Sequence, residues 1–125
     1  MRINPDYEQA HNKLGDVYLR QADIARALFH YTQVVQISPH KAAANTDLAS
    51  ALVMRQDFAR AQAHLDRAIR IQPNFARAYY MLGVMFESKG DRDNAEASYK
   101  RALNLARKQG QQGLACECER RLTQL

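Results

Sequence analysis

The sequence contains little of what metal centres and disulfide frameworks are built from. Its 125 residues include two cysteines, Cys116 and Cys118, and no second cysteine pair. On a helix, positions i and i+2 point to different sides, so this pair predicts neither a disulfide nor a shared metal site, and a zinc ribbon is excluded. His30 and His64 are one candidate metal pair, but no carboxylate recurs beside them, so we expect no metal and no cofactor.

Long apolar runs and catalytic motifs are also missing. No apolar run is long enough to span a bilayer, and no basic-then-apolar signal segment opens the chain. A glycine-rich phosphate loop and a G-x-S-x-G nucleophile motif are absent as well. From these absences, and from thiols that suit a reducing compartment, we expect a cytoplasmic chain with no membrane insertion and no enzymatic activity.

What the chain does contain is a unit that recurs every 34 residues. Its third copy, residues 76–105, joins two stretches of helical apolar spacing through a Lys89-Gly90-Asp91 break. Matching positions in the three copies hold Leu14, Gly15, Tyr18, Ala27 and Tyr31; Leu48, Ala49, Leu52, Ala61 and Leu65; and Leu82, Gly83, Phe86, Ala95 and Tyr99. We expect the large residues to fill the core and the small ones to permit close helix approach. A fixed period of this length predicts helix pairs that bury their apolar faces by stacking.

This unit resembles the tetratricopeptide repeat, and the resemblance covers residues 8–109. The chain departs from the family pattern at His11 and Asn45, where the family usually has tryptophan, and at Arg107, which replaces the third closing proline. Since an unpaired polar group is costly to bury, we expect His11 and Asn45 to be hydrogen-bonded or partly exposed. The resemblance implies an all-α, right-handed solenoid of three helix-turn-helix repeats, closed by a seventh, capping helix.

The expected bounds follow from proline, glycine and aspartate signals at matching repeat positions. We expect one domain over residues 1–125, with repeats at about 8–41, 42–75 and 76–109 and a capping segment at about 112–125. The predicted helices cover residues 5–20, 23–37, 39–55, 57–71, 73–89, 91–107 and 114–125. Asp23, Asp57 and Asp91 begin the second helix of each pair, where a carboxylate accepts hydrogen bonds from free backbone N–H groups.

Residues 1–7 carry a trace of the same period. Pro5 lies 34 residues before Pro39, which in turn lies 34 residues before Pro73. The opening therefore resembles the end of an earlier repeat, although Asn4-Pro5 would also serve as a helix cap. If an earlier repeat is missing, the first helix has an uncovered apolar face, and we expect homo-oligomers to form through it.

The charge of the chain is mixed in sign. The formal net charge is +5, and the excess is concentrated in residues 76–109. Basic residues of the second helices, such as Arg67 and Arg101, are interrupted by acids such as Asp66 and Glu96. Because a nucleic-acid surface usually presents a patch of one sign, we expect no nucleic-acid binding.

The resemblance places ligand binding on the concave side of the solenoid, which the first helices line. The candidate groove residues are the outward-facing positions of these helices: Gln9, Asn12, Asp16, Leu19 and Arg20; Ala43, Thr46, Ser50, Val53 and Met54; and Arg77, Tyr80, Val84, Glu87 and Ser88. Single exposed apolar residues are common on any surface. Leu19, Val53, Met54 and Val84, with Tyr80 beside them, nevertheless converge from three helices and predict an apolar binding patch.

The function that the resemblance implies is that of a protein-interaction module, which binds a peptide or partner protein in this groove. A self-association module and a regulatory segment of a larger multidomain enzyme are the alternatives. One branch of the family binds the terminal carboxylates of chaperone tails through a clamp of Lys, Asn and Arg side chains. The matching positions here hold Asn12, Asp16, Asp47 and Met81, with Arg77 alone keeping a basic group. Acids repel a carboxylate, so we expect no chaperone-tail binding; Asp16 and Glu87 suit a ligand with basic residues.

Overall fold

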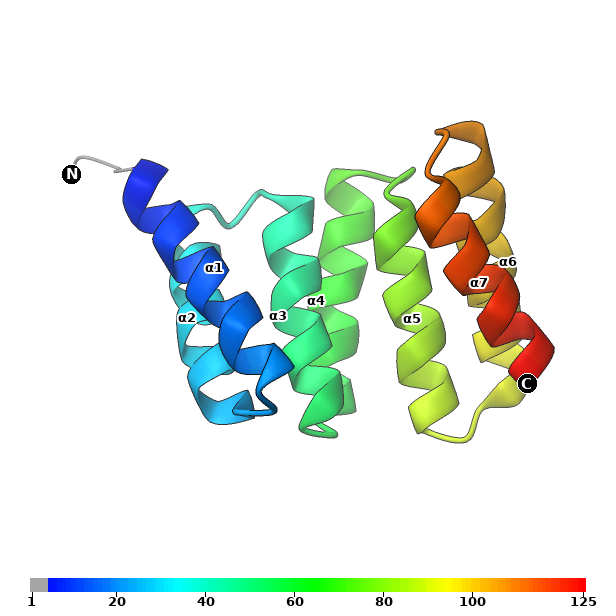
Figure 1. The fold of residues 1–125 in the computed structure, drawn as a ribbon, viewed down its shortest axis with the longest axis horizontal. Coiled ribbons are helices and arrows are strands. Elements are labelled where there is room, and N and C mark those ends of the chain that lie inside the picture. Colours follow the sequence, from blue (N-terminus) through cyan, green and yellow to red (C-terminus); the bar gives the residue numbers. More distant parts are fainter. Residues whose placement is uncertain (1–4) are drawn as a thin grey trace.

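The computed structural model describes the backbone of residues 5–125 and the side chains from Tyr7 onward, and this part of the chain is entirely helical apart from its turns (Figure 1). Its helices are α1 (Pro5–Arg20), α2 (Ile24–Ile37), α3 (Ala42–Met54), α4 (Phe58–Ile71), α5 (Ala76–Ser88), α6 (Arg92–Lys108) and α7 (Gln112–Gln124). Consecutive helices pack as pairs, and α7 packs on α6. The predicted all-α solenoid of three helix pairs and a capping helix is confirmed.

The helices form two layers. Figure 1 shows α1, α3, α5 and α7 in one layer, with α2, α4 and α6 behind them. The core lies between the layers, where Tyr31, Leu65 and Tyr99 of the second helices are buried at matching repeat positions. Leu14 was expected in this core but is exposed, because no helix of the described chain packs against that side of α1.

The aspartate caps are confirmed. Asp23, Asp57 and Asp91 each accept a hydrogen bond from the backbone N–H three residues later, at 3.3, 3.4 and 3.3 Å. Each cap follows a residue in the left-handed region: Ala22 at φ 61°, Gln56 at φ 65° and Gly90 at φ 81°. Only the third of these turns uses the residue type that takes this conformation without steric cost.

Two helices begin later than the sequence predicted. We expected helices to start at Pro39 and Pro73, but α3 and α5 start three residues further on. Lys41 N–H donates to the carbonyl of Ser38 at 3.2 Å, and Phe75 N–H donates to the carbonyl of Gln72 at 3.1 Å. Both prolines therefore occupy the second position of a β-turn, which the fixed φ of proline favours.

Polar side chains stand where the resemblance predicts tryptophan. Asn45 is fully buried, and its Nδ2 donates to two backbone oxygens at 3.1 and 3.0 Å. His64 Nδ1 donates to Asn45 Oδ1 at 3.0 Å, and His11 Nδ1 lies 2.9 Å from His30 Nδ1. The expected hydrogen bonding is confirmed for Asn45, whereas His11 is bonded through Nδ1 only and its Nε2 is buried with no partner among the described residues. His30 and His64 each pair within their own repeat instead of with one another.

The C-terminal helix α7 begins at Gln112, ahead of the predicted start at Leu114. Cys118 is buried against α6 while Cys116 is exposed, and both thiols are free. Burial raises the pKa of the Cys118 thiol to about 11, so it is an unreactive core residue. Among the described residues, no cluster of histidine, cysteine and acidic side chains is arranged to hold a metal ion, and no helix has the length and apolar character needed to cross a bilayer.

Candidate functional site

The groove face is the surface of α1, α3 and α5 that points away from the second helices, with α7 at its end. On this face, carboxylates and arginines form pairs between neighbouring helices. Arg77 of α5 lies 3.0 Å from the carboxylate of Asp47 on α3, and Arg77 also donates to the backbone oxygen of Ala43 at 3.3 Å. The basic group that a carboxylate ligand would need is therefore already neutralised inside the protein.

Two acids of this face lie close enough to influence one another. Burial raises the pKa of Asp47, Arg77 opposes that change, and the neighbouring Asp16 carboxylate adds to it. Asp16 itself accepts a hydrogen bond from the hydroxyl of Tyr31. A negative charge that a ligand brings to these two acids would be repelled, while a ligand cation would be attracted.

At the other end of the face, α7 is joined to α5 by a network of polar contacts. Tyr80 donates to Glu117 at 3.1 Å, and Tyr99 donates to Glu87 at 2.7 Å. Arg121 of α7 lies between the two acids, 3.5 Å from Glu87 and 3.3 Å from Glu117. Burial raises the pKa values of both tyrosines, and their bonds to carboxylates raise them further.

This network changes the roles predicted for two candidate residues. Tyr80 and Glu87 were expected to face a ligand, but each is half-buried in contacts that hold the capping helix. The partners Glu117 and Arg121 lie more than 30 residues away in the chain, so the repeat pattern could not reveal them. Both side chains therefore position α7, and the apolar patch loses Tyr80.

Two further candidates belong to the core. Thr46 is buried and donates its hydroxyl to the carbonyl of Ala42 at 2.9 Å, and Val53 is buried among apolar side chains. The reason is the central place of α3, which packs against α2, α4 and α5. A helix with neighbours on several sides is apolar nearly all round, and the run of small residues in α3 was the signal for it.

The remaining candidates keep varying degrees of exposure. Gln9, Arg20, Ala43, Met54 and Ser88 are exposed, whereas Asn12, Asp16, Leu19, Ser50, Arg77 and Val84 are half-buried. Ser50 donates its hydroxyl to the backbone oxygen of Asp47 at 2.6 Å. Leu19 and Val84 pack against the core, so they offer part of their surface only.

Two hollows on the groove face meet at Ala43. The first, of about 170 Å³, lies between α1 and α3 and is lined by Glu8, Asn12, Lys41 and Asp47, among others. The second, of about 490 Å³, lies beside α3, α5 and the start of α7, and its lining is Ala43, Phe75, Arg77, Gln111 and Leu114. The guanidinium of Arg77 lies 5.5 Å from the centre of the Phe75 ring. The geometry thus adds Glu8, Phe75 and Leu114 to the predicted site; they lie at helix ends, outside the positions that the repeat pattern marks.

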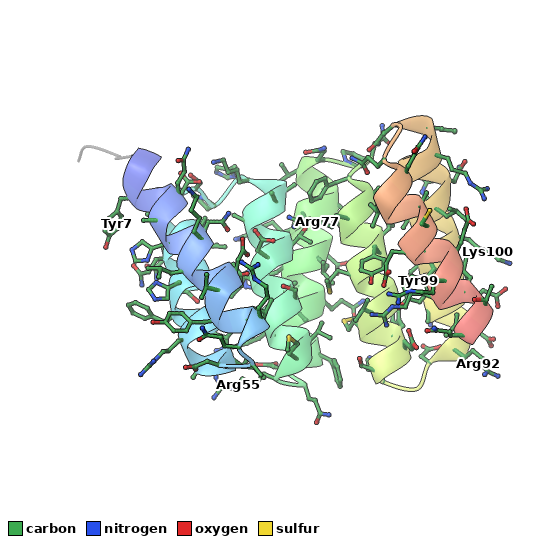
Figure 2. All side chains as sticks on the ribbon, in the orientation of Figure 1. Tyr7, Arg55, Arg77, Arg92, Tyr99 and Lys100 are labelled. Atoms are coloured by element: carbon green, nitrogen blue, oxygen red, sulfur yellow. The ribbon has the colours of Figure 1, made fainter. Side chains whose placement is uncertain are left out.

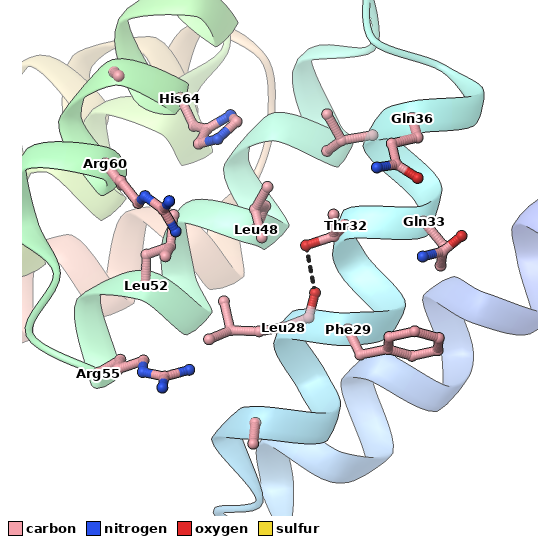
Figure 3. A pocket seen from close by; sticks show the side chains of 13 residues that line it. Leu28, Phe29, Thr32, Gln33, Gln36, Leu48, Leu52, Arg55, Arg60 and His64 are labelled. Atoms are coloured by element: carbon pink, nitrogen blue, oxygen red, sulfur yellow. Dashed lines mark hydrogen bonds between the residues drawn. The ribbon is translucent and has the colours of Figure 1, made fainter.

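A larger hollow lies on the opposite layer, between α2 and α4 (Figure 3). Its volume is about 590 Å³, and Leu28, Leu48 and Leu52 form its apolar floor. One repeat later, Leu52 is replaced by the larger Phe86. The residues that line this hollow include no carboxylate, and Arg55 and Arg60 lie at its edge (Figure 3).

Comparison with models of known protein families identifies the repeat. Models of the tetratricopeptide repeat match residues 18–85 and 76–109. No curated protein matches the chain significantly.

Solved structures share the fold. The TPR2B domain of yeast Sti1, in its complex with pHsp70, is 22% identical over 94% of each chain, with a TM-score of 0.83. The first TPR of Spaghetti (RPAP3), bound to the HSP90 peptide SRMEEVD, is 21% identical over 99% of this chain and 96% of that one, with a TM-score of 0.76. The Arabidopsis OM64 TPR domain is 22% identical over 95% and 96%, also with a TM-score of 0.76. With the 34-residue period, the confirmed helix pairs and a family match over more than half of its length, the chain belongs to the tetratricopeptide repeat family.

Proposed function

We propose that the chain is a non-enzymatic protein-interaction module, whose groove face binds a segment of a partner protein across Ala43. The observation that carries this proposal is the meeting of the two hollows at Ala43, beside the Asp47–Arg77 ion pair. Phe75 and Leu114 offer apolar surface on one side, and the other side holds the carboxylates of Glu8 and Asp47, which are paired with Lys41 at 2.6 Å and with Arg77 at 3.0 Å. Such a mixture suits a peptide that anchors an apolar side chain and places a basic one nearby.

The charge of the face sets the class of partner. The relatives described above include domains in complex with pHsp70 and with the acidic HSP90 peptide SRMEEVD. In this chain the corresponding face presents Asp16 and Asp47, and Arg77 is engaged by Asp47. Burying a ligand carboxylate here would meet repulsion, and the two cations that line the hollows, Lys41 and Arg77, are already paired with Glu8 and Asp47. We therefore expect a partner segment with lysine or arginine next to an apolar residue.

A selection from a random peptide library displayed on phage, with the chain immobilised, tests this proposal. The expected result is enrichment of peptides that combine basic and apolar residues. Ala43→Arg places a bulky cation where the hollows meet and should abolish capture. Ala97→Arg, at an exposed alanine of α6 on the other layer, is the matched control and should leave capture unchanged. Enrichment of acidic peptides, or capture that survives Ala43→Arg, would contradict the proposal.

The two alternatives involve different surfaces. A regulatory segment of a multidomain enzyme would use the same groove face, with another part of that enzyme as its ligand. Self-association is favoured by a separate observation on α1, which concerns the end of the solenoid and not its groove.

A further inference from the structure

The first helix pair carries most of the exposed large apolar side chains. Among the side chains that the structure describes, six large apolar ones are exposed, and four of them are Tyr7, Leu14, Val17 and Phe29. The first three lie on one face of α1, together with the exposed Ala10. We call Tyr7, Ala10, Leu14 and Val17 the α1 end face. It lies at the outer end of the stack, where Figure 2 shows Tyr7 directed away from the other helices.

The matching positions of the other two repeats show what such a face contacts. Leu14 is 42% exposed, whereas Leu48 and Leu82 at the matching positions are 5% and 9% exposed. Val17 is 40% exposed, whereas Ala51 and Met85 are both 0% exposed. In α3 and α5 these positions pack against the preceding helix pair. The α1 end face thus has the residue types of an inter-repeat interface, but no described part of the chain covers it.

We propose that the α1 end face binds the same face of a second copy of this chain, giving a two-fold symmetric dimer. The other end of the solenoid would be a poor binding partner for the α1 end face, because the outer side of α7 presents the exposed polar side chains of Glu119, Arg120 and Thr123. A head-to-tail contact would bury these groups against leucine and valine without partners. The isologous contact instead places apolar surface on apolar surface and closes after two copies.

The two α1 helices pack antiparallel. Along the axis of α1, the middle of the end face is level with residue 12, midway between Tyr7 and Val17. A two-fold axis at this level places Ala10 opposite Leu14 of the other copy. Tyr7 then lies opposite Val17, and large side chains meet small ones, as close packing requires. A parallel arrangement would set Leu14 against Leu14 and leave Ala10 facing Ala10. The face spans about 15 Å of helix at 1.5 Å per residue, which is small for a protein interface, so the dimer is weak and concentration-dependent.

Sedimentation velocity over about a hundredfold range of protein concentration tests the dimer. The expected result for the wild-type chain is a shift from monomer to dimer as concentration rises. Val17→Glu sets a carboxylate in the contact, opposite Tyr7 of the other copy, and should hold the chain monomeric throughout. Ile71→Glu, at a 37% exposed apolar residue of α4, is the matched control and should dimerise like the wild type. Thermal unfolding of each variant verifies that both are folded.

A monomeric wild-type chain at every concentration would overturn the proposal, as would an equal loss of association in both variants. Disulfide trapping then tests the register in a Cys116→Ser background, which removes the exposed native thiol. A mixture of Ala10→Cys and Leu14→Cys chains should cross-link faster than either variant alone. Faster cross-linking of Leu14→Cys with itself would overturn the antiparallel register.

Discussion

Gly83 lies against the ring of Tyr99 so closely that a Cβ atom at residue 83 would be 2.6 Å from ring atoms Cδ1 and Cε1. Gly15 has the same relationship to Tyr31, with a distance of 2.6 Å to Cε1. The middle repeat holds Ala49 and Leu65 at these two positions, so the larger residue on the first helix accompanies a smaller one on the second. The sizes of the two side chains are therefore coupled across each helix pair.

A double-mutant cycle tests this coupling. Gly83→Ala should cost about 1–3 kcal/mol through overpacking, reduced by the roughly 1 kcal/mol by which alanine favours a helix. In a chain that already carries Tyr99→Leu, the same change should cost less or become stabilising, because the ring is gone. Urea denaturation of the four chains measures the coupling energy. Additive effects would show that the glycine and the ring are independent.

The left-handed turns offer a pair of opposite substitutions. Gln56 has φ 65° without being glycine, and Gly90 has φ 81° with open space around its Cα. Gln56→Gly should stabilise the chain by up to about 1 kcal/mol, because the strain of a left-handed side chain exceeds the entropy that glycine loses. Gly90→Ala should destabilise it by a comparable amount. Thermal unfolding measures both, and shifts of the same sign would contradict the assigned turn geometry.

The contact between half-buried His64 and buried Asn45 predicts a pH dependence of stability. Burial lowers the pKa of His64 from its ordinary 6.5, and the charges of Arg67 and Arg60 lower it further. As the pH falls below 6.5, the unfolded chain therefore binds more protons than the folded chain. The stability that depends on a neutral His64 is present above this pH and is lost on acidification. His64→Gln keeps a hydrogen-bond donor but does not titrate, and should flatten the decline in unfolding free energy between about pH 7 and pH 5.

The exposed His40 is the control for this measurement. His40→Gln makes the same change of residue type at an exposed turn position and should leave the free energy of unfolding at pH 7 as it is in the wild type. Equal slopes in the wild type and in His64→Gln would show that the Asn45 contact does not require a neutral imidazole.

The charge of the groove face predicts weak recognition of acidic chaperone tails. The peptide SRMEEVD, which is the ligand of the RPAP3 domain, should bind this chain no more tightly than a scrambled peptide of the same composition. The cause is the Asp47 carboxylate, which occupies Arg77 and repels the tail. Fluorescence anisotropy with labelled peptides measures the two affinities. A clear preference for the ordered sequence would mean that Arg77 leaves Asp47 to bind the ligand.

The features that could be predicted from the sequence are those set by local chemistry and by the repeat. The 34-residue period determined the helix pairs, and Asp23, Asp57 and Asp91 marked the starts of the second helices correctly. Proline was a weaker guide, because Pro39 and Pro73 suit a β-turn as well as a first helical turn.

The site was less accessible to sequence reasoning, for reasons of packing. The repeat pattern treats the three first helices as equivalent, but α3 packs against α2, α4 and α5, which buries Thr46 and Val53. The pattern also ends before α7, whose Arg121 engages Glu87 from 34 residues away. That Asp16 and Asp47 set the charge of a binding groove stays a prediction. Their internal partners, Tyr31 and Arg77, depend on how the helices cross.

The most direct test of the central claim is an NMR titration of the isotope-labelled chain with a peptide taken from the library selection. If the groove face is the binding site, the largest amide shifts will cluster at Ala43, Asp47 and Arg77, and Ala43→Arg will remove them. Shifts centred instead on Leu28, Leu52 and Arg60 would place the ligand in the hollow of the opposite layer and contradict the account.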